Sequence, residues 1–414
     1  MFQYRAGQLH CEQADLNALA AEYGTPAYVY SKSAILDRWN EYERALSGIP
    51  HRVCFAVKAN SNLAVLASLT RVGSGFDIVS GGELQRVLKA GGDPGRVVFS
   101  GVGKTAAEIS LALEKGIHSF NCESETEIEL ISQIAAAKGT KASIALRVNP
   151  DVNAKTHPYI STGLKEHKFG VDIAAAEEIY GRAAGLPGIA AEGVSCHIGS
   201  QLLELEPLLE AADKTLALVA RLRAAGLEIR YLDLGGGLGV QYQPQERSAS
   251  VEEFAARLRP KLASLNLILM LEPGRSIVAE AGILLTRVLL VKQNGAKTFV
   301  VVDGAMNDLL RPALYQAHHE ITPVNEAQGA LTMTADVVGP VCETGDFFAR
   351  DRQLPALKPG DLIALRTAGA YGFVLSSNYN SRPRPCELLV DGSQVFVARQ
   401  RETFADLIRG ESLP

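Results

Sequence analysis

A lysine at the end of an apolar run is the residue best placed for covalent chemistry. Lys58 follows the apolar residues 53–57 and precedes Ala59 and Asn60. At the end of a buried strand, the loss of water around the ammonium favours the neutral amine. A neutral amine is the form that makes a Schiff base with a carbonyl compound. The alternative is a strand-end lysine whose ammonium extends back to water.

Glu272 and His197 also end apolar runs, and their side chains suit a flat heteroaromatic ring. A carboxylate beside a pyridine nitrogen keeps that nitrogen protonated. The protonated ring is then the electron sink that carbanion chemistry at the α-carbon of an amino acid requires. The imidazole of His197 can stack on such a ring, and Ser200 can donate to a phosphate. A single strand-end histidine is more often structural, so His197 is a candidate only together with the other residues.

Glycines after two later runs favour a phosphate-binding loop. Residues 235–237 are all glycine and follow the run 230–234, and Gly274 follows the run 267–271. Backbone N–H groups without side chains approach a phosphate closely. The alternative is that these glycines serve tight turns alone.

Two other motifs are rejected. Residues 101–105 resemble the end of a P-loop, but Val98 stands where the first glycine is needed. Residues 235–240 resemble a dinucleotide fingerprint, but a Gln-Tyr-Gln-Pro stretch follows where a helix should begin.

Apolar runs that alternate with helical patterns position these candidates. Eight such runs are typical of a (β/α)8 barrel, whose loops after strands seven and eight commonly bind phosphate. A doubly wound open sheet is the competing architecture. We favour the barrel because the candidate residues follow nearly all the runs and do not gather at one crevice. The predicted strands are residues 53–57, 75–79, 96–100, 119–122, 143–148, 193–197, 230–234 and 267–271.

Beyond about residue 280, short apolar runs are separated by turn pairs such as Asn294-Gly295 and Asp391-Gly392. This pattern predicts an all-β second domain, built as a β-sandwich or a barrel-like sheet. The predicted fold class is therefore α/β plus all-β. We expect residues 1–30 to join the β domain, residues 31–278 to form the barrel, and residues 279–414 to form the C-terminal β domain.

The composition argues against several classes of function. The chain of 414 residues has a net charge of -5 and no basic tract, which argues against a general nucleic-acid binder. It has no 18-residue apolar run and no signal-peptide core at its N-terminus, so neither a membrane span nor secretion is expected. Its six cysteines are scattered and form no metal-binding spacing. That usage fits reduced thiols in a cytoplasmic protein.

Five motifs together resemble those of the fold-type III pyridoxal-phosphate decarboxylases, in that family's order and over nearly the whole chain. They are FAVKAN at 55–60, HIGSQ at 197–201, GGG at 235–237, EPGR at 272–275 and CE at 342–343. Within the family, the sequence is most similar to the members that decarboxylate diaminopimelate, as residues 311–315, 341–346 and 368–372 indicate. The resemblance implies decarboxylation of meso-diaminopimelate at its D-centre to L-lysine and CO2, the last step of lysine biosynthesis.

The resemblance also implies a set of residues around pyridoxal 5'-phosphate. Lys58 would hold the cofactor as a Schiff base, with Asp77 near the lysine and Arg147 near the ring oxygen. Glu83 would pair with Arg147; alternatively, Asp77 and Arg147 form a structural ion pair at the barrel rim. His197 would stack on the ring and Glu272 would bind its nitrogen. The full implied set is Lys58, Asp77, Arg147, His197, Ser200, Gly236, Gly237, Glu272, Gly274, Arg275, Ser276, Ile277 and Tyr371.

A further implied set would bind the substrate. Arg275, Arg311 and Tyr315 would hold a carboxylate, and Glu343 would hold the distal amino group, beside Tyr371. An arginine provides the planar fork that a carboxylate prefers, whereas a decarboxylase for ornithine would need an acidic group there. Cys342 would be the proton donor, reaching in from the partner subunit of a homodimer, because a thiol is a competent acid at neutral pH. The polar segment 151–167 is a candidate for a mobile loop.

Other interpretations remain open at this point. Cys342 could be an inert thiol and Arg311 a surface ion-pair residue. The chain could decarboxylate ornithine or arginine, or bind the cofactor without catalysis, although relatives without catalysis usually lack the lysine, the cysteine or the substrate arginines. Racemases of related fold place an arginine against the pyridine nitrogen, so Glu272 opposes that function.

Overall fold

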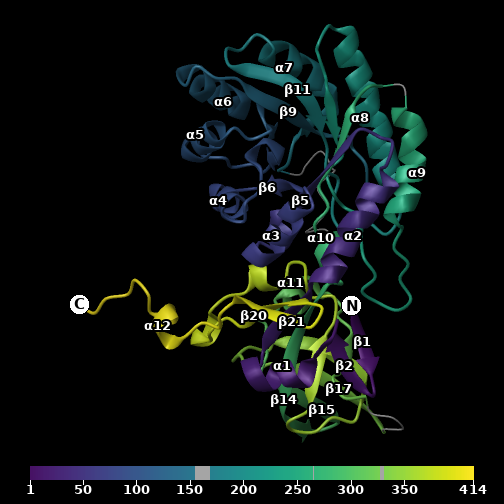
Figure 1. Cartoon of the computed structure of the whole chain (residues 1–414), viewed down its shortest axis with the longest axis vertical. Helices are drawn as coiled ribbons and strands as arrows, with labels where there is room; N and C mark the ends of the chain where they lie inside the picture. The colour runs from purple at the N-terminus through teal and green to yellow at the C-terminus, as the bar shows by residue number, and fades with distance from the viewer. Residues whose placement is uncertain (154–167, 264, 327–330) are drawn as a thin grey trace. The chain divides into compact units, whose positions relative to one another are not determined.

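The computed structural model describes residues 1–153, 168–263, 265–326 and 331–414 (Figure 1). The segment 151–167, predicted to be mobile, lies outside the described residues from 154 onward. Contacts divide the chain into two compact units. The barrel unit comprises Arg38–Val240 and Arg247–Ser276, and the β unit comprises Met1–Asp37, Gln241–Glu246 and Ile277–Pro414. The predicted domain limits after residues 30 and 278 remain a proposal.

Eight parallel strands form a closed ring in the barrel unit, in the order β5-β6-β7-β8-β9-β11-β12-β13, because β13 pairs with β5 and β8 pairs with β9. This confirms the predicted barrel and excludes the open sheet. Every ring strand overlaps its predicted run. The strands are β5 His51–Ala56, β6 Gly75–Ile78, β7 Val97–Phe99, β8 Ser119–Cys122, β9 Ala142–Asn149, β11 Ile189–Ser195, β12 Tyr231–Asp233 and β13 Ile268–Leu271. A short β10, Val171–Asp172, pairs parallel with the last two residues of β9.

Helices between the strands surround the ring (Figure 1). Local sequence sets where several of them begin: Thr105 and Ser250 each form a capping box with a glutamate three residues on. None of the helices in the described ranges is long and apolar enough to cross a membrane. The helices are α2 Lys32–Ala45, α3 Leu63–Arg71, α4 Gly81–Lys89, α5 Ala106–Lys115, α6 Glu125–Ala137, α7 Ala176–Ala183, α8 Glu206–Ala224, α9 Val251–Leu262 and α10 Arg275–Val278.

The β unit is built on a sheet of strand order β18-β17-β15-β14-β4-β20-β21, with β19 joining β14 and β16 joining β19. A separate three-stranded sheet, β1-β2-β3, precedes it. Short helices α1 Leu16–Tyr23, α11 Arg311–Tyr315 and α12 Phe404–Leu407 complete the unit. The strands are β1 Phe2–Arg5, β2 Gln8–Cys11, β3 Ala14–Asp15, β4 Ala27–Ser31, β14 Gly282–Asn294, β15 Lys297–Val302, β16 Ile321–Pro323, β17 Thr332–Val338, β18 Phe347–Pro355, β19 Leu362–Leu365, β20 Cys386–Asp391 and β21 Gln394–Arg399.

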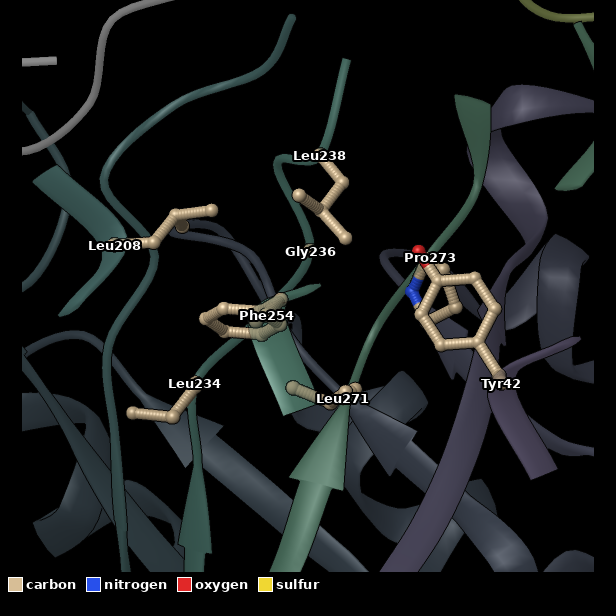
Figure 2. A pocket seen from close by; sticks show the side chains of 9 residues that line it. Tyr42, Leu208, Leu234, Gly236, Leu238, Phe254, Leu271 and Pro273 are labelled. Atoms are coloured by element: carbon tan, nitrogen blue, oxygen red, sulfur yellow. The ribbon is translucent and has the colours of Figure 1, made fainter. Parts of the chain in front are cut away.

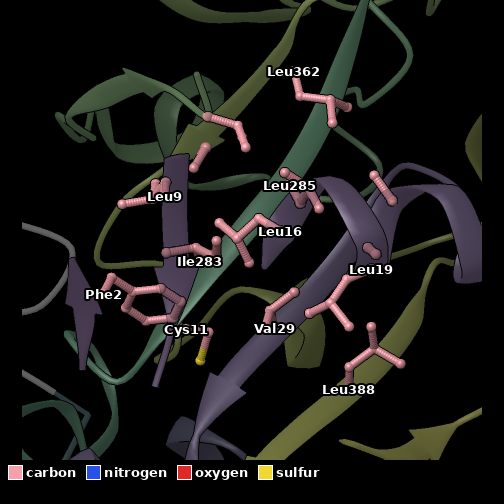
Figure 3. Close-up of a cluster of buried hydrophobic side chains, with 14 of the residues drawn as sticks. Phe2, Leu9, Cys11, Leu16, Leu19, Val29, Ile283, Leu285, Leu362 and Leu388 are labelled. Atoms are coloured by element: carbon pink, nitrogen blue, oxygen red, sulfur yellow. The ribbon is translucent and has the colours of Figure 1, made fainter. Parts of the chain in front are cut away.

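The N-terminal segment belongs to this sheet, as predicted. Strand β4 lies between β14, with which it pairs antiparallel, and β20, with which it pairs parallel. Figure 3 shows Leu16 of α1, Val29 of β4, Ile283 of β14 and Leu388 of β20 in one buried cluster. Burial of apolar surface therefore joins the two ends of the chain. The apolar runs beyond residue 280, at 283–292, 297–302, 332–338, 361–365, 387–390 and 394–397, match β14, β15, β17, β19, β20 and β21 but omit β16 and β18. In β18 the Arg350–Arg352 stretch interrupts the apolar pattern.

The lysine of the rejected P-loop motif has a structural role in the barrel unit. Lys104 Nζ donates to Glu127 Oε1 at 2.6 Å and to the carbonyl oxygens of Gly101 and Asn121 at 2.8 Å each. Its side chain is 1% exposed and that of Glu127 is 10% exposed. The ammonium is thus held by groups of the barrel itself.

We predict that Glu127→Ala lowers the free energy of unfolding by about 3 to 5 kcal/mol, because it leaves the Lys104 ammonium buried without its carboxylate. Glu125→Ala on the same helix is the matched control. Its partner, Arg182, lies at the surface, where ion pairs contribute little. Urea unfolding of both variants measures the difference, and equal losses would contradict the prediction.

Candidate active site

Lys58 lies in a single 3-10 turn, Val57–Ala59, directly after β5. Its Nζ donates to Oδ2 of Asp77 at 2.6 Å. Asp77 stands on β6, the neighbouring strand, and is fully buried, whereas the lysine side chain is 35% exposed. The strand-end position predicted that the ammonium loses its water; the side chain is instead partly exposed and paired with a carboxylate. The structure therefore places Asp77 beside the lysine, as the resemblance implied.

Arg147 on β9 pairs with Glu123, with 3.0 Å between Nη1 and Oε1. The prediction that Glu83 pairs with Arg147 is wrong, and so is the alternative of an Asp77–Arg147 pair. Glu123 follows β8, which adjoins β9 in the ring, whereas Glu83 follows β6. Arg147 also donates from Nη2 to the carbonyl oxygen of His197 at 3.3 Å.

His197 follows β11 and carries a neutral ring. The backbone N–H of Gly236 donates to its Nδ1 at 3.3 Å, so that nitrogen holds no proton. Burial lowers the pKa of His197 well below its usual range, and the positive charges of Arg147 and Lys58 lower it further. A neutral, flat imidazole held in this way is suited to stacking.

Glu272 follows β13 and belongs to a buried polar cluster. The Asn121 amide donates from Nδ2 to Glu272 Oε1 at 3.1 Å, to Asp233 Oδ2 at 2.9 Å and to Ser100 Oγ at 3.2 Å. Ser100 Oγ also donates to Glu272 Oε1 at 3.3 Å. The implied set omitted Ser100, Asn121 and Asp233. Each is a polar residue at the end of a predicted apolar strand, and this pattern could have revealed them.

The two acids of this cluster share their environment. Burial raises the pKa of Glu272 well above its usual range; the carboxylates of Asp233 and Asp77 raise it further, while Lys58 opposes them. Burial also raises the pKa of Asp233, which is fully buried. Two acids this close are expected to hold one proton between them. Glu272 is therefore suited to a hydrogen bond with a ring nitrogen.

The glycine loop is required by packing. A side chain at Gly236 would meet the carbonyl oxygen of Glu272 at 2.3 Å, and one at Gly237 would meet Leu202 at 2.6 Å. At Gly274 it would meet the Cβ of Ala59 at 2.8 Å. Close packing thus accounts for these glycines, and they do not by themselves indicate a phosphate.

An apolar pocket supports the same loop. Figure 2 shows Tyr42, Leu208, Leu238 and Phe254 around Gly236 and Pro273. Its lining contains none of the charged residues of the polar site. We interpret the pocket as packing behind the loop.

A cation lies beside the predicted phosphate residues. Arg275 donates to Ser200 Oγ from Nη2 at 3.1 Å and from Nε at 3.3 Å. Ser276 Oγ lies 2.7 Å from the hydroxyl of Tyr42. This guanidinium with its hydroxyl partner is a donor set that suits an anion.

The remaining predicted residues lie in the β unit. Arg311 and Tyr315 begin and end α11, and Arg311 is buried. Cys342 is exposed, whereas the other five cysteines are buried. Tyr371 has a left-handed backbone, with φ of 54°. Ile277, in α10, is buried.

A clamped turn carries Cys342 and Glu343. The carboxylate of Asp346 accepts the N–H groups of Val341 and Met306 at 2.7 Å each, and its own N–H donates to the carbonyl oxygen of Glu343 at 3.0 Å. The backbone N–H of Cys342 donates to Asn380 at 2.9 Å. The backbone that carries the thiol is therefore fixed from both sides.

Residues 32–279 match the family model of pyridoxal-dependent decarboxylases, which describes the pyridoxal-binding domain. The chain is 56% identical over 412 residues to a diaminopimelate decarboxylase of Pseudomonas aeruginosa, covering 100% of this chain and 99% of that one. The chain belongs to this decarboxylase family. The relative from Vibrio cholerae, also named diaminopimelate decarboxylase, is 52% identical, with 100% and 99% covered.

Solved structures agree with the family. Diaminopimelate decarboxylase from M. jannaschii, in complex with L-lysine, has a TM-score of 0.95 at 37% identity, covering 100% of this chain and 98% of that one. The enzyme from Helicobacter pylori, also with L-lysine, has a TM-score of 0.92 at 46% identity, covering 95% and 98%.

The barrel residues fit pyridoxal phosphate, the cofactor of the family. They offer an amine at Lys58, a neutral ring at His197, a proton-sharing acid at Glu272 and a guanidinium at Arg275. In addition, Asp77 Oδ1 and Arg147 Nε are buried with no hydrogen-bond partner in the described part of the chain. Such atoms are expected to meet polar groups of a ligand.

The pKa of Glu83, which follows β6, can be tested through the pH dependence of stability. Burial raises its pKa from 4.5 to about 7; the N–H of Val79 opposes the shift, the charge of Asp77 adds to it and Lys58 opposes it. The folded protein thus keeps a proton that the unfolded chain releases near pH 4.5. The contribution of Glu83 to stability must then fall as the pH rises from about 4.5 to 7.

We predict that Glu83→Gln removes this fall and raises the free energy of unfolding at pH 7.5 by about 1 to 3 kcal/mol relative to the unchanged protein. Urea unfolding at pH 4.5, 6 and 7.5 measures the slope. The control is Glu114→Gln, at an exposed site. A slope that is unchanged in Glu83→Gln would contradict the prediction.

Proposed function

We propose that this chain decarboxylates meso-diaminopimelate at its D-centre and releases L-lysine and CO2, the last step of lysine biosynthesis. The observation that carries the proposal is similarity to diaminopimelate decarboxylases over essentially the full length of both chains, at 56% identity in the relative from P. aeruginosa. Two solved relatives named for this activity were determined with L-lysine bound.

When bound, pyridoxal phosphate supplies the electron sink for the carbanion left by CO2. Lys58 would hold the cofactor covalently, with Asp77 fixing the position of the amine. Glu272 would hydrogen-bond the ring nitrogen and keep it protonated. His197 would lie against the ring face, and Arg147, fixed by Glu123, would bind the ring oxygen.

The cofactor's phosphate would be held by a third group of residues. Ser200 and Tyr371 would supply hydroxyls, and the glycine loops and the backbone of residues 274–277 would supply N–H groups. Because the glycines are already required by packing, the support for this assignment comes from Ser200, whose Oγ accepts from Arg275 and can donate its own proton. The proposed set is Ser200, Gly236, Gly237, Gly274, Arg275, Ser276, Ile277 and Tyr371.

Charge complementarity supports the substrate assignment. Diaminopimelate has a carboxylate at each end and loses only one. Arg311, with Arg275 and Tyr315, would bind the carboxylate that stays, and Glu343 would bind the amino group beside it. The reacting carboxylate must be left without a cation, since a strong ion pair would stabilise it against loss as CO2.

Cys342 would protonate the carbanion. The exposed thiol on a backbone turn clamped by Asp346 is consistent with a group that must reach the reacting carbon. We further propose that two chains form a homodimer and that Cys342 reaches the site of the partner chain. The unpaired state of all six cysteines suits a cytoplasmic enzyme.

The purified protein with pyridoxal phosphate is expected to release CO2 from meso-diaminopimelate. It should not do so from LL-diaminopimelate, ornithine or arginine, each supplied separately. Detection of CO2 together with L-lysine tests both the substrate and the reacting centre. Release from ornithine or arginine in place of the meso compound would favour the alternative of a decarboxylase for another basic amino acid.

Cys342→Ala is expected to lower kcat about 100-fold or more, because a positioned general acid contributes at least that much. Cys386→Ser, in the β unit and away from the clamped turn, is the control. A shared site can be tested with mixed dimers of Lys58→Ala and Cys342→Ala chains, each inactive alone. Mixing should restore activity, since one of the two sites would then have both residues. Full turnover by Cys342→Ala would remove the cysteine from the mechanism.

A further inference from the structure

Arg311 is held in the β unit by two side chains that the motifs did not indicate. Its Nη1 lies 2.9 Å from Nε2 of His319, and its guanidinium carbon lies 4.5 Å from the ring centre of Tyr242. The rings of His319 and Tyr242 meet edge to face, with 5.6 Å between their centres. Arg311 is 5%, Tyr242 8% and His319 0% exposed.

The hydrogen bonds of His319 fix its protonation state. A guanidinium can only donate, so Nε2 must accept from Arg311. Nδ1 lies 2.8 Å from the carbonyl oxygen of Arg366, which can only accept, so Nδ1 must donate. The imidazole is therefore neutral, with its proton on Nδ1.

Tyr242 reaches Arg311 because of an unusual path of the chain. It lies in Gln241–Glu246, a segment between two barrel elements whose contacts group it with the β unit. The N–H groups of Tyr242 and Gln243 both donate to Oε2 of Glu246, at 2.9 and 3.1 Å. This turn fixes the tyrosine backbone.

Both contacts orient the guanidinium, and neither carries a negative charge. A neutral imidazole fixes the direction of one N–H, and the aromatic face fixes the plane. A charged guanidinium held in this way is preorganised for a carboxylate ligand, because less side-chain freedom is lost on binding.

We propose that His319 and Tyr242 are positioning residues for Arg311 and thereby determine the preference for a substrate with a distal carboxylate. The inference rests on the proposed function, in which Arg311 binds that carboxylate. Neither residue needs to touch the substrate, so their effect should appear in binding and not in the chemical step.

The test compares His319→Leu, which removes the acceptor, with His319→Gln, which can retain one, and Tyr242→Leu with Tyr242→Phe, which keeps the ring. We expect KM for meso-diaminopimelate to rise about tenfold in His319→Leu and about threefold to fivefold in Tyr242→Leu. In His319→Gln and Tyr242→Phe, KM should stay within about threefold of its value in the unchanged protein. In all four variants, kcat should change by less than about threefold. His318→Leu is the matched control, since His318 contacts Arg352 and Glu320.

Two inhibitors distinguish a change in the orientation of Arg311 from a general loss of structure. L-Lysine carries the distal carboxylate, whereas 1,5-diaminopentane has the same two amines and no carboxylate. In the leucine variants, the inhibition constant of L-lysine should rise in parallel with KM, while that of 1,5-diaminopentane stays within about twofold. Thermal melting and the absorbance of bound pyridoxal phosphate show whether each variant is folded; if His319→Leu is not, Tyr242→Leu and its phenylalanine partner carry the test.

Two results would overturn the inference: an unchanged KM in both leucine variants, or equal weakening of L-lysine and 1,5-diaminopentane. Either result leaves the proposed function intact, provided that the unchanged protein decarboxylates meso-diaminopimelate. Failure of the unchanged protein to do so overturns the proposed function itself.

Discussion

The pairing of β8 with β9 closes the barrel, and the site in the barrel unit depends on that closure. A closed ring of parallel strands has no edges and brings the carboxyl end of every strand to the same rim. Lys58, Asp77, Arg147 and Glu272 lie at or just beyond the ends of four different strands, so closure gathers them on one rim. Asp77 is 19 residues from Lys58 in sequence but lies on the adjacent strand.

Charges at this rim are stabilised in pairs, and each pair joins neighbours in the ring. Lys58 and Asp77 join β5 and β6; Arg147 and Glu123 join β9 and β8. An unpaired buried charge is costly, so adjacency decides which partner is available. The third pair, Asp233 at the end of β12 and Glu272 directly after β13, consists of two acids. Without a ligand this pair retains a proton. A cation beside it, such as a protonated ring nitrogen, would favour the ionised form of Glu272.

In the β unit, two uncharged side chains orient a buried cation. Arg311 is buried beside a neutral imidazole and an aromatic face, and hydrogen bonds fix the imidazole in its neutral form. The turn that carries Cys342 is likewise fixed through its backbone, by the carboxylate of Asp346. At Arg311 the supporting groups fix the orientation of a side chain. At Cys342 they fix the backbone and do not bond to the thiol itself.

The sequence alone indicated the eight strands of the barrel and several of the candidate site residues, because apolar periodicity and strand-end polar residues are local features. The likeness of short motifs to a known family then indicated the cofactor and the reaction. The sequence could not determine most of the contacts between these residues. The partner of Arg147 is Glu123 and not Glu83, the acid cluster includes Asn121 and Asp233, and Tyr242 crosses into the β unit. Only the tertiary structure decided these contacts, because they depend on which strands are neighbours and on where a loop returns, and neither is encoded within a short stretch of chain.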